Sequence, residues 1–165
     1  ESYLCGFANS RDIDITVFRP TTLVGPVASG HPIPGHAVMS LLRAVAEDDA
    51  LTIYTPEVLR DYLYVNDMVS LIIQELAMPL VASSYEAYNV GSGVELLLTD
   101  VLDIARSVIG QAAGKVKYVS SNAHPSVTRL PLDKASNRFN IAPTTPEVWI
   151  TDILESFGGI KEVRR

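Results

Sequence analysis

A strand-like run that leads directly into a helical run does most to limit the fold of this chain. Arg60-Asp61 precedes an apolar run that ends at Val65, and Asn66-Asp67 stands at the head of an amphipathic segment. One face of that segment is formed by Met68, Val69, Ile72, Ile73 and Leu76. These residues predict a strand followed by a helix, with Asn66 or Asp67 as the helix cap.

Strand and helix patterns alternate along the rest of the chain. Strands are expected at 13–19, 51–54, 87–90 and 116–119, and helices at about 1–10, 38–45, 98–109, 134–139 and 150–157. The segment from Gly25 to Gly35 holds three prolines and is expected to be a long loop. Such alternation indicates an α/β chain with at least two parallel strands.

Length and charge exclude several classes of function. The 165 residues are 47% hydrophobic and 19% charged, which is typical of one globular domain. No apolar run reaches the roughly 18 residues that a membrane span needs. The net charge of −6 argues against a nucleic-acid binder, because the 13 lysines and arginines cluster only at Arg164-Arg165.

Cysteine and histidine usage points to neither disulfides nor metal. The single cysteine, Cys5, excludes an internal disulfide and suits a reducing cytoplasm. The three histidines, His31, His36 and His124, have no partners at metal-ligand spacing, so no metal site is predicted.

Four segments carry a resemblance to a known family. They are Arg19 to Pro26, Leu51 to Asp61, Tyr88 to Gly93, and Lys134 to Pro143. In this order they resemble motifs of the extended short-chain dehydrogenase/reductase family, above all its NAD(P)-dependent nucleotide-sugar epimerases and dehydratases. The resemblance covers nearly the whole chain. It implies the C-terminal part of a Rossmann-like fold, namely the last parallel strands plus a small α/β substrate-binding subdomain.

The same resemblance implies roles for five residues. Arg60 would grip a substrate phosphate with its rigid fork of donors, and Tyr54 would stack on the nucleotide base. Thr22 replaces an asparagine that binds substrate phosphate in the family, and its hydroxyl reaches less far. Arg129 would bring a second arginine to the diphosphate. Pro20 would meet the nicotinamide edge of NAD or NADP.

Several of these residues also have a structural interpretation. Arg60 could pair with Asp61 or Glu57, Tyr54 could be a core residue, and Pro20 could simply end a strand. Gly91-Ser92-Gly93 is interpreted as a tight turn. It is not a dinucleotide fingerprint, because position 96 is leucine where the third glycine is required.

Two elements that such enzymes need for catalysis are not found in the sequence. No tyrosine is followed by lysine four residues later, and no G-x-x-G-x-x-G loop occurs. The first would supply the general base and the second would hold the cofactor pyrophosphate. Glu1 is similar to a glutamate that follows the catalytic lysine in the family. The chain is therefore expected to be the C-terminal half, inactive and without bound cofactor when alone.

The expected organisation follows from that resemblance. Residues 1–26 would end the Rossmann-like core, and residues 27–165 would be mainly substrate-binding subdomain, with one core strand returning near 87–91. The partners would be a nucleotide sugar, the missing N-terminal half and, in the intact enzyme, a second copy of the chain.

Two alternatives remain open from the residues alone. One is a non-catalytic nucleotide-sugar binding module. The other is a related reductase of a non-sugar carbonyl: Arg60 speaks against it, while Thr22 and the altered turn at 55–57 keep it open.

Overall fold

The computed structural model describes residues 1–11, 13–28, 35–54, 57–79, 85–110, 116–119 and 130–158. Its helices are α1 (Ser2–Arg11), α2 (Ala37–Glu47), α3 (Val65–Leu76), α4 (Leu98–Ile109), α5 (Asp133–Arg138) and α6 (Pro146–Ser156). Its strands are β1 (Ile15–Pro20), β2 (Thr22–Val24), β3 (Leu51–Tyr54), β4 (Arg60–Tyr64), β5 (Tyr85–Val90), β6 (Glu95–Leu96) and β7 (Val116–Val119). Strands and helices alternate, so the predicted α/β class is confirmed.

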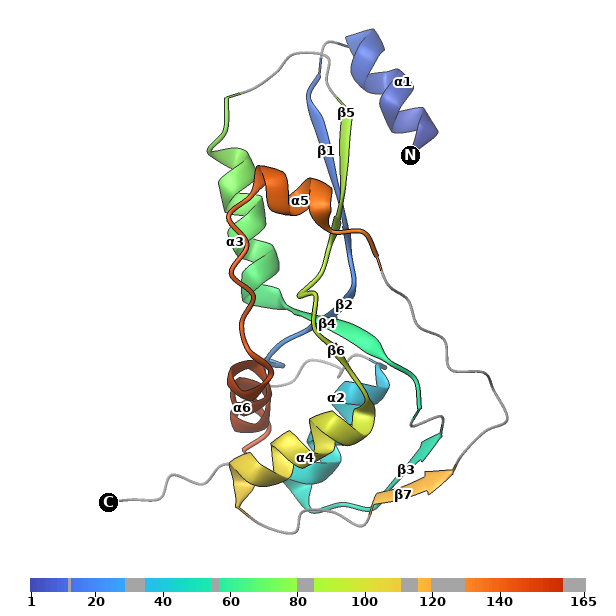
Figure 1. Cartoon of the computed structure of the whole chain (residues 1–165), viewed down its shortest axis with the longest axis vertical. Coiled ribbons are helices and arrows are strands. Elements are labelled where there is room, and N and C mark those ends of the chain that lie inside the picture. Colours follow the sequence, from blue (N-terminus) through green and yellow to red (C-terminus); the bar gives the residue numbers. More distant parts are fainter. Residues whose placement is uncertain are drawn as a thin grey trace.

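The described strands form three small sheets. β1 pairs with β5 and β3 with β7, both in parallel, while β4 lies between parallel β2 and antiparallel β6. The molecule is elongated, with α1, α3 and α5 beside β1 and β5 at one end and α2, α4 and α6 near β3 and β7 at the other (Figure 1). β2, β4 and β6 lie between the two ends. None of the helices in the described ranges is long and apolar enough to cross a membrane.

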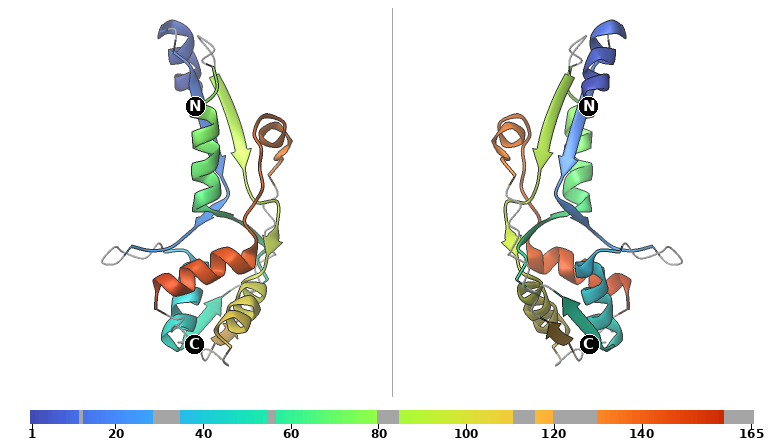
Figure 2. Two further views of the ribbon diagram at one scale, coloured as in Figure 1. Left: turned by 90° about the vertical axis from the view of Figure 1, so that its left-hand side faces the viewer. Right: turned by 90° about the vertical axis from the view of Figure 1, so that its right-hand side faces the viewer.

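Two hydrophobic clusters match the two ends of the molecule. The larger one is built on α2, α4 and α6, which Figure 2 shows gathered at one end. Trp149 of α6 is fully buried there and its ring lies 5.9 Å from that of Tyr62. The smaller cluster places Leu71 of α3 and Phe139 against Tyr88 of β5. Between the clusters, β4 contributes residues to both, which fixes its first residue, Arg60, at the middle of the molecule.

The predicted cap of α3 is wrong. Tyr64 occupies the N-cap position, so Asn66 and Asp67 lie inside the first turn. The Asp67 carboxylate accepts hydrogen bonds from the Thr144 backbone N–H at 2.9 Å and the Thr144 hydroxyl at 2.7 Å. Asp67 therefore holds the segment before α6 against α3 and does not cap its own helix.

Most of the apolar face predicted for α3 is exposed, although Met68 packs against the smaller cluster. Leu71 is the buried residue of this helix, whereas Ile73 is 60% exposed and Leu76 80% exposed.

Two strands, β2 and β6, were not expected from the sequence. Each is only two or three residues long and forms by pairing with β4, so neither leaves a periodic pattern.

Candidate functional site

Two neighbouring cavities bring together four of the five residues that the sequence analysis selected. Pro20, Thr22 and Arg60 line a cavity of about 550 Å³. Thr22 and Arg60 also line a second cavity of about 190 Å³, together with Tyr54. Because both cavities share Thr22 and Arg60, they form one continuous candidate site.

The topology explains this convergence. β1 ends at Pro20, and after Thr21 the chain continues as β2, which lies parallel to β4 with Thr22 opposite Tyr62. Arg60 is the first residue of β4, two residues before Tyr62. Three strand ends thus meet at one place, where side chains are held by sheet pairing yet face open space. Pro20 also ends its strand, so its structural interpretation is compatible with a place in the site.

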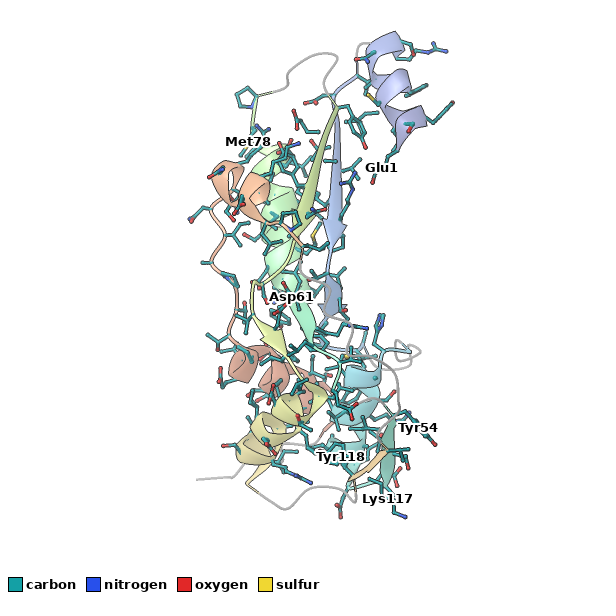
Figure 3. All side chains as sticks on the ribbon, turned by 45° about the vertical axis from the view of Figure 1, so that its right-hand side comes forward. Glu1, Tyr54, Asp61, Met78, Lys117 and Tyr118 are labelled. Atoms are coloured by element: carbon teal, nitrogen blue, oxygen red, sulfur yellow. The ribbon has the colours of Figure 1, made fainter. Side chains whose placement is uncertain are left out.

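Tyr54 ends β3 and Arg60 begins β4, so only five residues separate them along the chain. One guanidinium N–H of Arg60 donates to the Leu59 carbonyl oxygen at 3.0 Å, which orients the group at the strand end. Tyr54 is the last residue of β3 and is 67% exposed, so the interpretation as a core tyrosine is wrong. Figure 3 shows Tyr54 near the tip of β3, at the same end of the molecule as Tyr118 of β7.

Tyr62 adds a hydroxyl to the smaller cavity. It is almost fully buried, and burial raises its pKa to about 12, although the nearby Arg60 guanidinium acts in the opposite direction. The hydroxyl therefore remains protonated at neutral pH. It can donate a hydrogen bond in the cavity, but it is poorly suited to act as a base.

Asp61 and His36 belong to the site but were not selected from the sequence. Asp61 lines the larger cavity and is only 8% exposed. A carboxylate directly before an apolar run was the signal that could have singled it out, because a buried charge needs specific partners. His36 lines both cavities at the N-cap position of α2. A lone histidine after a loop carries no comparable signal.

The remaining candidate, Arg129, lies outside the described residues, although the next residue, Leu130, lines the larger cavity. His31 and His124, for which no metal role was predicted, also lie outside them. Within the parts of the chain that the structure describes, no group of three or more His, Cys, Asp or Glu residues could hold a metal ion.

The comparison with protein families identifies the relationship directly. The NAD dependent epimerase/dehydratase family matches residues 1–91, which is more than half of the 165-residue chain. The chain belongs to this family. The matched range contains every site residue described above except Leu130, and it includes β1, β2, β3, β4 and β5. The resemblance stated from the sequence is therefore confirmed.

Curated relatives of this family member include two plant proteins. The putative GDP-L-fucose synthase 2 of Arabidopsis thaliana is 27% identical over 139 residues, which cover 81% of the chain and 40% of the relative. The probable GDP-L-fucose synthase 1 of Oryza sativa subsp. japonica is 31% identical over 108 residues, which cover 62% of the chain and 32% of the relative. The chain thus spans well under half the length of these relatives.

Solved structures confirm the Rossmann-like fold of this family member. UDP-glucuronic acid 4-epimerase from Bacillus cereus, in complex with UDP-glucuronic acid and NAD, superposes with a TM-score of 0.76 at 22% identity, covering 95% of this chain and 49% of that one. UDP-N-acetylglucosamine 4-epimerase from Methanobrevibacter ruminantium M1 gives 0.79 at 18% identity, covering 95% and 50%. RMD from Pseudomonas aeruginosa, complexed with NADPH, gives 0.77 at 20% identity, covering 94% and 52%.

Proposed function

We propose that this chain binds a nucleotide sugar and forms the substrate-binding half of an NAD(P)-dependent nucleotide-sugar epimerase or dehydratase. The observation that carries the proposal is the convergence of Arg60, Thr22 and Tyr54, from three different strands, on two adjoining cavities. A nucleotide sugar needs hydrogen-bond donors for its phosphates and an aromatic surface for its flat base along one continuous site.

Each residue has a distinct part in the proposed site. The Arg60 guanidinium binds the diphosphate, because its paired N–H groups match two phosphate oxygens. The Thr22 hydroxyl donates a further hydrogen bond beside it, and the exposed Tyr54 ring stacks on the base. Arg129, which directly precedes the cavity residue Leu130, adds a second positive charge to the diphosphate.

The dinucleotide, NAD or NADP, accepts and returns a hydride when it is bound in enzymes of this kind. This chain's own contribution is limited to Pro20, whose exposed strand end lines the larger cavity and would border the nicotinamide. Its 165 residues contain neither a Tyr-x-x-x-Lys sequence nor a G-x-x-G-x-x-G loop. We propose that the chain alone does not retain the dinucleotide and does not turn substrate over. Measurable turnover by the isolated chain would contradict this.

An exposed apolar surface supports a further part of the proposal, namely that a dinucleotide-binding half packs against this chain. Among the described strands, β1 and β5 pair only with each other, and a sheet of two strands is marginally stable by itself. Parallel sheets are also normally covered on both faces. α3 exposes Val69, Ile73 and Leu76 beside them. The proposed covering half could lie on the same polypeptide or on another.

The organisation and setting of the protein are proposed on the same basis. Residues 1–26 would belong to the Rossmann-like core, which β5 rejoins by pairing with β1, and the remainder would be mainly substrate-binding subdomain. The rings of Tyr3 and Phe7 stack on an exposed face of α1, with their centroids 6.2 Å apart. This exposed aromatic face supports the proposal that α1 pairs two copies of the protein. The single cysteine is in keeping with a cytoplasmic setting.

Calorimetric titration tests the substrate proposal. We expect the chain to bind a GDP-sugar or a UDP-sugar, and Arg60→Ala to weaken that binding about 10- to 100-fold, since a hydrogen bond to a charged group contributes about 1.5–3 kcal/mol. Arg43→Ala is the matched control, because Arg43 is an exposed arginine paired with Glu47 and lines neither cavity of the site. Equal affinity of the unmodified chain and Arg60→Ala would refute the phosphate role.

A further inference from the structure

Asp61 connects three segments of the chain at the floor of the larger cavity. Its Oδ1 atom accepts hydrogen bonds from the Ser92 backbone N–H at 2.9 Å, the Ser92 hydroxyl at 2.8 Å and the Thr21 hydroxyl at 3.3 Å. Its Oδ2 atom accepts one from the Gly93 backbone N–H at 3.0 Å. The carboxylate thus ties β4 both to the β1–β2 connection and to the turn after β5.

Two of these three segments, the β1–β2 connection and β4, carry proposed substrate contacts. Thr21 lies between Pro20 and Thr22, and its backbone N–H also donates to the Val90 carbonyl oxygen at 2.8 Å. Arg60 directly precedes Asp61, and both side chains line the larger cavity. Figure 3 shows Asp61 near the middle of the elongated molecule, where the strands meet. A change at Asp61 is therefore expected to affect the segments that bear Thr22 and Arg60.

The packing around the carboxylate leaves it little freedom. Asp61 is 8% exposed, and Gly91 lies so close that a Cβ atom there would meet Asp61 Oδ2. Two of its donors are backbone N–H groups in a turn that has no other described partner for them. A neutral side chain of the same shape would break this pattern, since an amide offers only one acceptor atom.

From this geometry we propose that Asp61 is a positioning residue of the substrate site, which holds the start of β4, where Arg60 lies, and the Pro20–Thr22 wall in register for a diphosphate. The inference rests on the proposed function. It assigns to Asp61 no contact with substrate: the residue acts through Arg60 and Thr22. A change at Asp61 should therefore weaken the binding of a nucleoside diphosphate more than the binding of the phosphate-free nucleoside.

Asp61→Asn is the direct perturbation. Whichever way the amide is turned, its NH₂ group faces the N–H of Ser92 or of Gly93, so one of these donors loses its acceptor. We expect about tenfold weaker binding of a nucleoside diphosphate, and a change of less than about twofold for the phosphate-free nucleoside. In the Arg60→Ala background, Asp61→Asn should weaken binding by clearly less than tenfold, because only its effect through Thr22 remains.

A matched control separates positioning from loss of stability. The Asp67 carboxylate also accepts one backbone N–H and one hydroxyl, both from Thr144, but lines neither cavity. Asp67→Asn should therefore destabilise the fold while leaving nucleoside diphosphate binding unchanged. If Asp61→Asn does not fold, Ser92→Ala, which removes one donor to Oδ1 and keeps the charge, should show the same phosphate-selective loss on a smaller scale.

The outcomes distinguish the two proposals. No binding by the unmodified chain, or unaltered binding by Arg60→Ala, overturns the proposed function and with it the role of Asp61. If Arg60→Ala clearly weakens binding, the proposed function stands, and three results would overturn the positioning role alone. Asp61→Asn could show its full effect in the Arg60→Ala background, or weaken binding of the phosphate-free nucleoside as much as that of the diphosphate. Asp67→Asn could also weaken diphosphate binding as much as Asp61→Asn does. Unchanged phosphate affinity of Ser92→Ala, where Asp61→Asn is unfolded, overturns it as well.

Discussion

Replacing Gly91 with alanine should destabilise the chain although the backbone there permits any residue. Gly91 does not have a positive φ, unlike Gly93 and Gly110, so alanine meets no backbone penalty. A Cβ atom at Gly91 would instead overlap Asp61 Oδ2 and lie 3.0 Å from Thr21 Cγ2. The Asp61 carboxylate cannot simply move away, because the Ser92 and Gly93 groups fix both oxygens.

The expected cost follows from these contacts. Forcing an extra methyl group into a packed interior costs about 1–3 kcal/mol. Moving the carboxylate also weakens hydrogen bonds to a charged group, which contribute about 1.5–3 kcal/mol each when intact. The smaller conformational entropy of unfolded alanine offsets about 0.5 kcal/mol of this. Gly91→Ala should therefore lower the free energy of unfolding by about 2–4 kcal/mol.

Urea unfolding followed by circular dichroism measures this change. Gly6→Ala is the control, since Gly6 lies within α1 with nothing within 4 Å of its Cβ position, and alanine there should stabilise by about 0.5–1 kcal/mol. In an Asp61→Ala background the cost of Gly91→Ala should fall below about 1 kcal/mol, because the obstructing oxygen is gone. A loss under about 0.5 kcal/mol in the unmodified background would refute the close approach of Gly91 and Asp61.

Two further predictions concern the two ends of the molecule. Burial and the hydrogen bond that Tyr64 donates to Asp152 at 2.7 Å raise the pKa of Tyr64 to about 12, so the folded state keeps a proton that the unfolded chain releases near pH 10. The contribution of Tyr64 to the free energy of unfolding is thus fully present below about pH 10 and is lost toward pH 12. In alkaline unfolding titrations, Tyr64→Phe should therefore lose stability less steeply with pH than the unmodified chain. An unchanged slope would contradict this. On α3, Ile73→Lys and Leu76→Lys should change the stability of the isolated chain by less than about 0.5 kcal/mol, whereas Leu71→Ala should cost about 2–5 kcal/mol in urea unfolding. Large losses at Ile73 and Leu76 would show that the isolated chain covers this face.

Local periodicity was sufficient for most of the fold. The face of α2 at Val38, Leu41, Leu42 and Val45 is buried as predicted, and α4 ends at Gly110 with a φ of 71°. Elements set by distant partners were not predictable. β2 and β6 exist because β4 lies between them, and Asp67 bonds Thr144, 77 residues away, in place of its own helix end.

The candidate site shows the same division. Pro20, Thr22, Tyr54 and Arg60 were selected from motif positions, and the structure brings them to two adjoining cavities. Asp61 was treated only as an ion-pair partner for Arg60. Its role as acceptor for the turn after β5 depends on residues about 30 positions later, which no local pattern connects to it.

The location of a bound nucleotide sugar tests the central claim most directly. A crystal structure of the chain with a GDP-sugar or a UDP-sugar should place the diphosphate against Arg60 and Thr22, with the base at Tyr54 and the sugar toward Pro20. Ligand bound elsewhere, such as in the cleft between β1 and α3 lined by Phe18 and Leu76, would contradict the account. So would a ligand in the larger cavity whose phosphates do not contact Arg60.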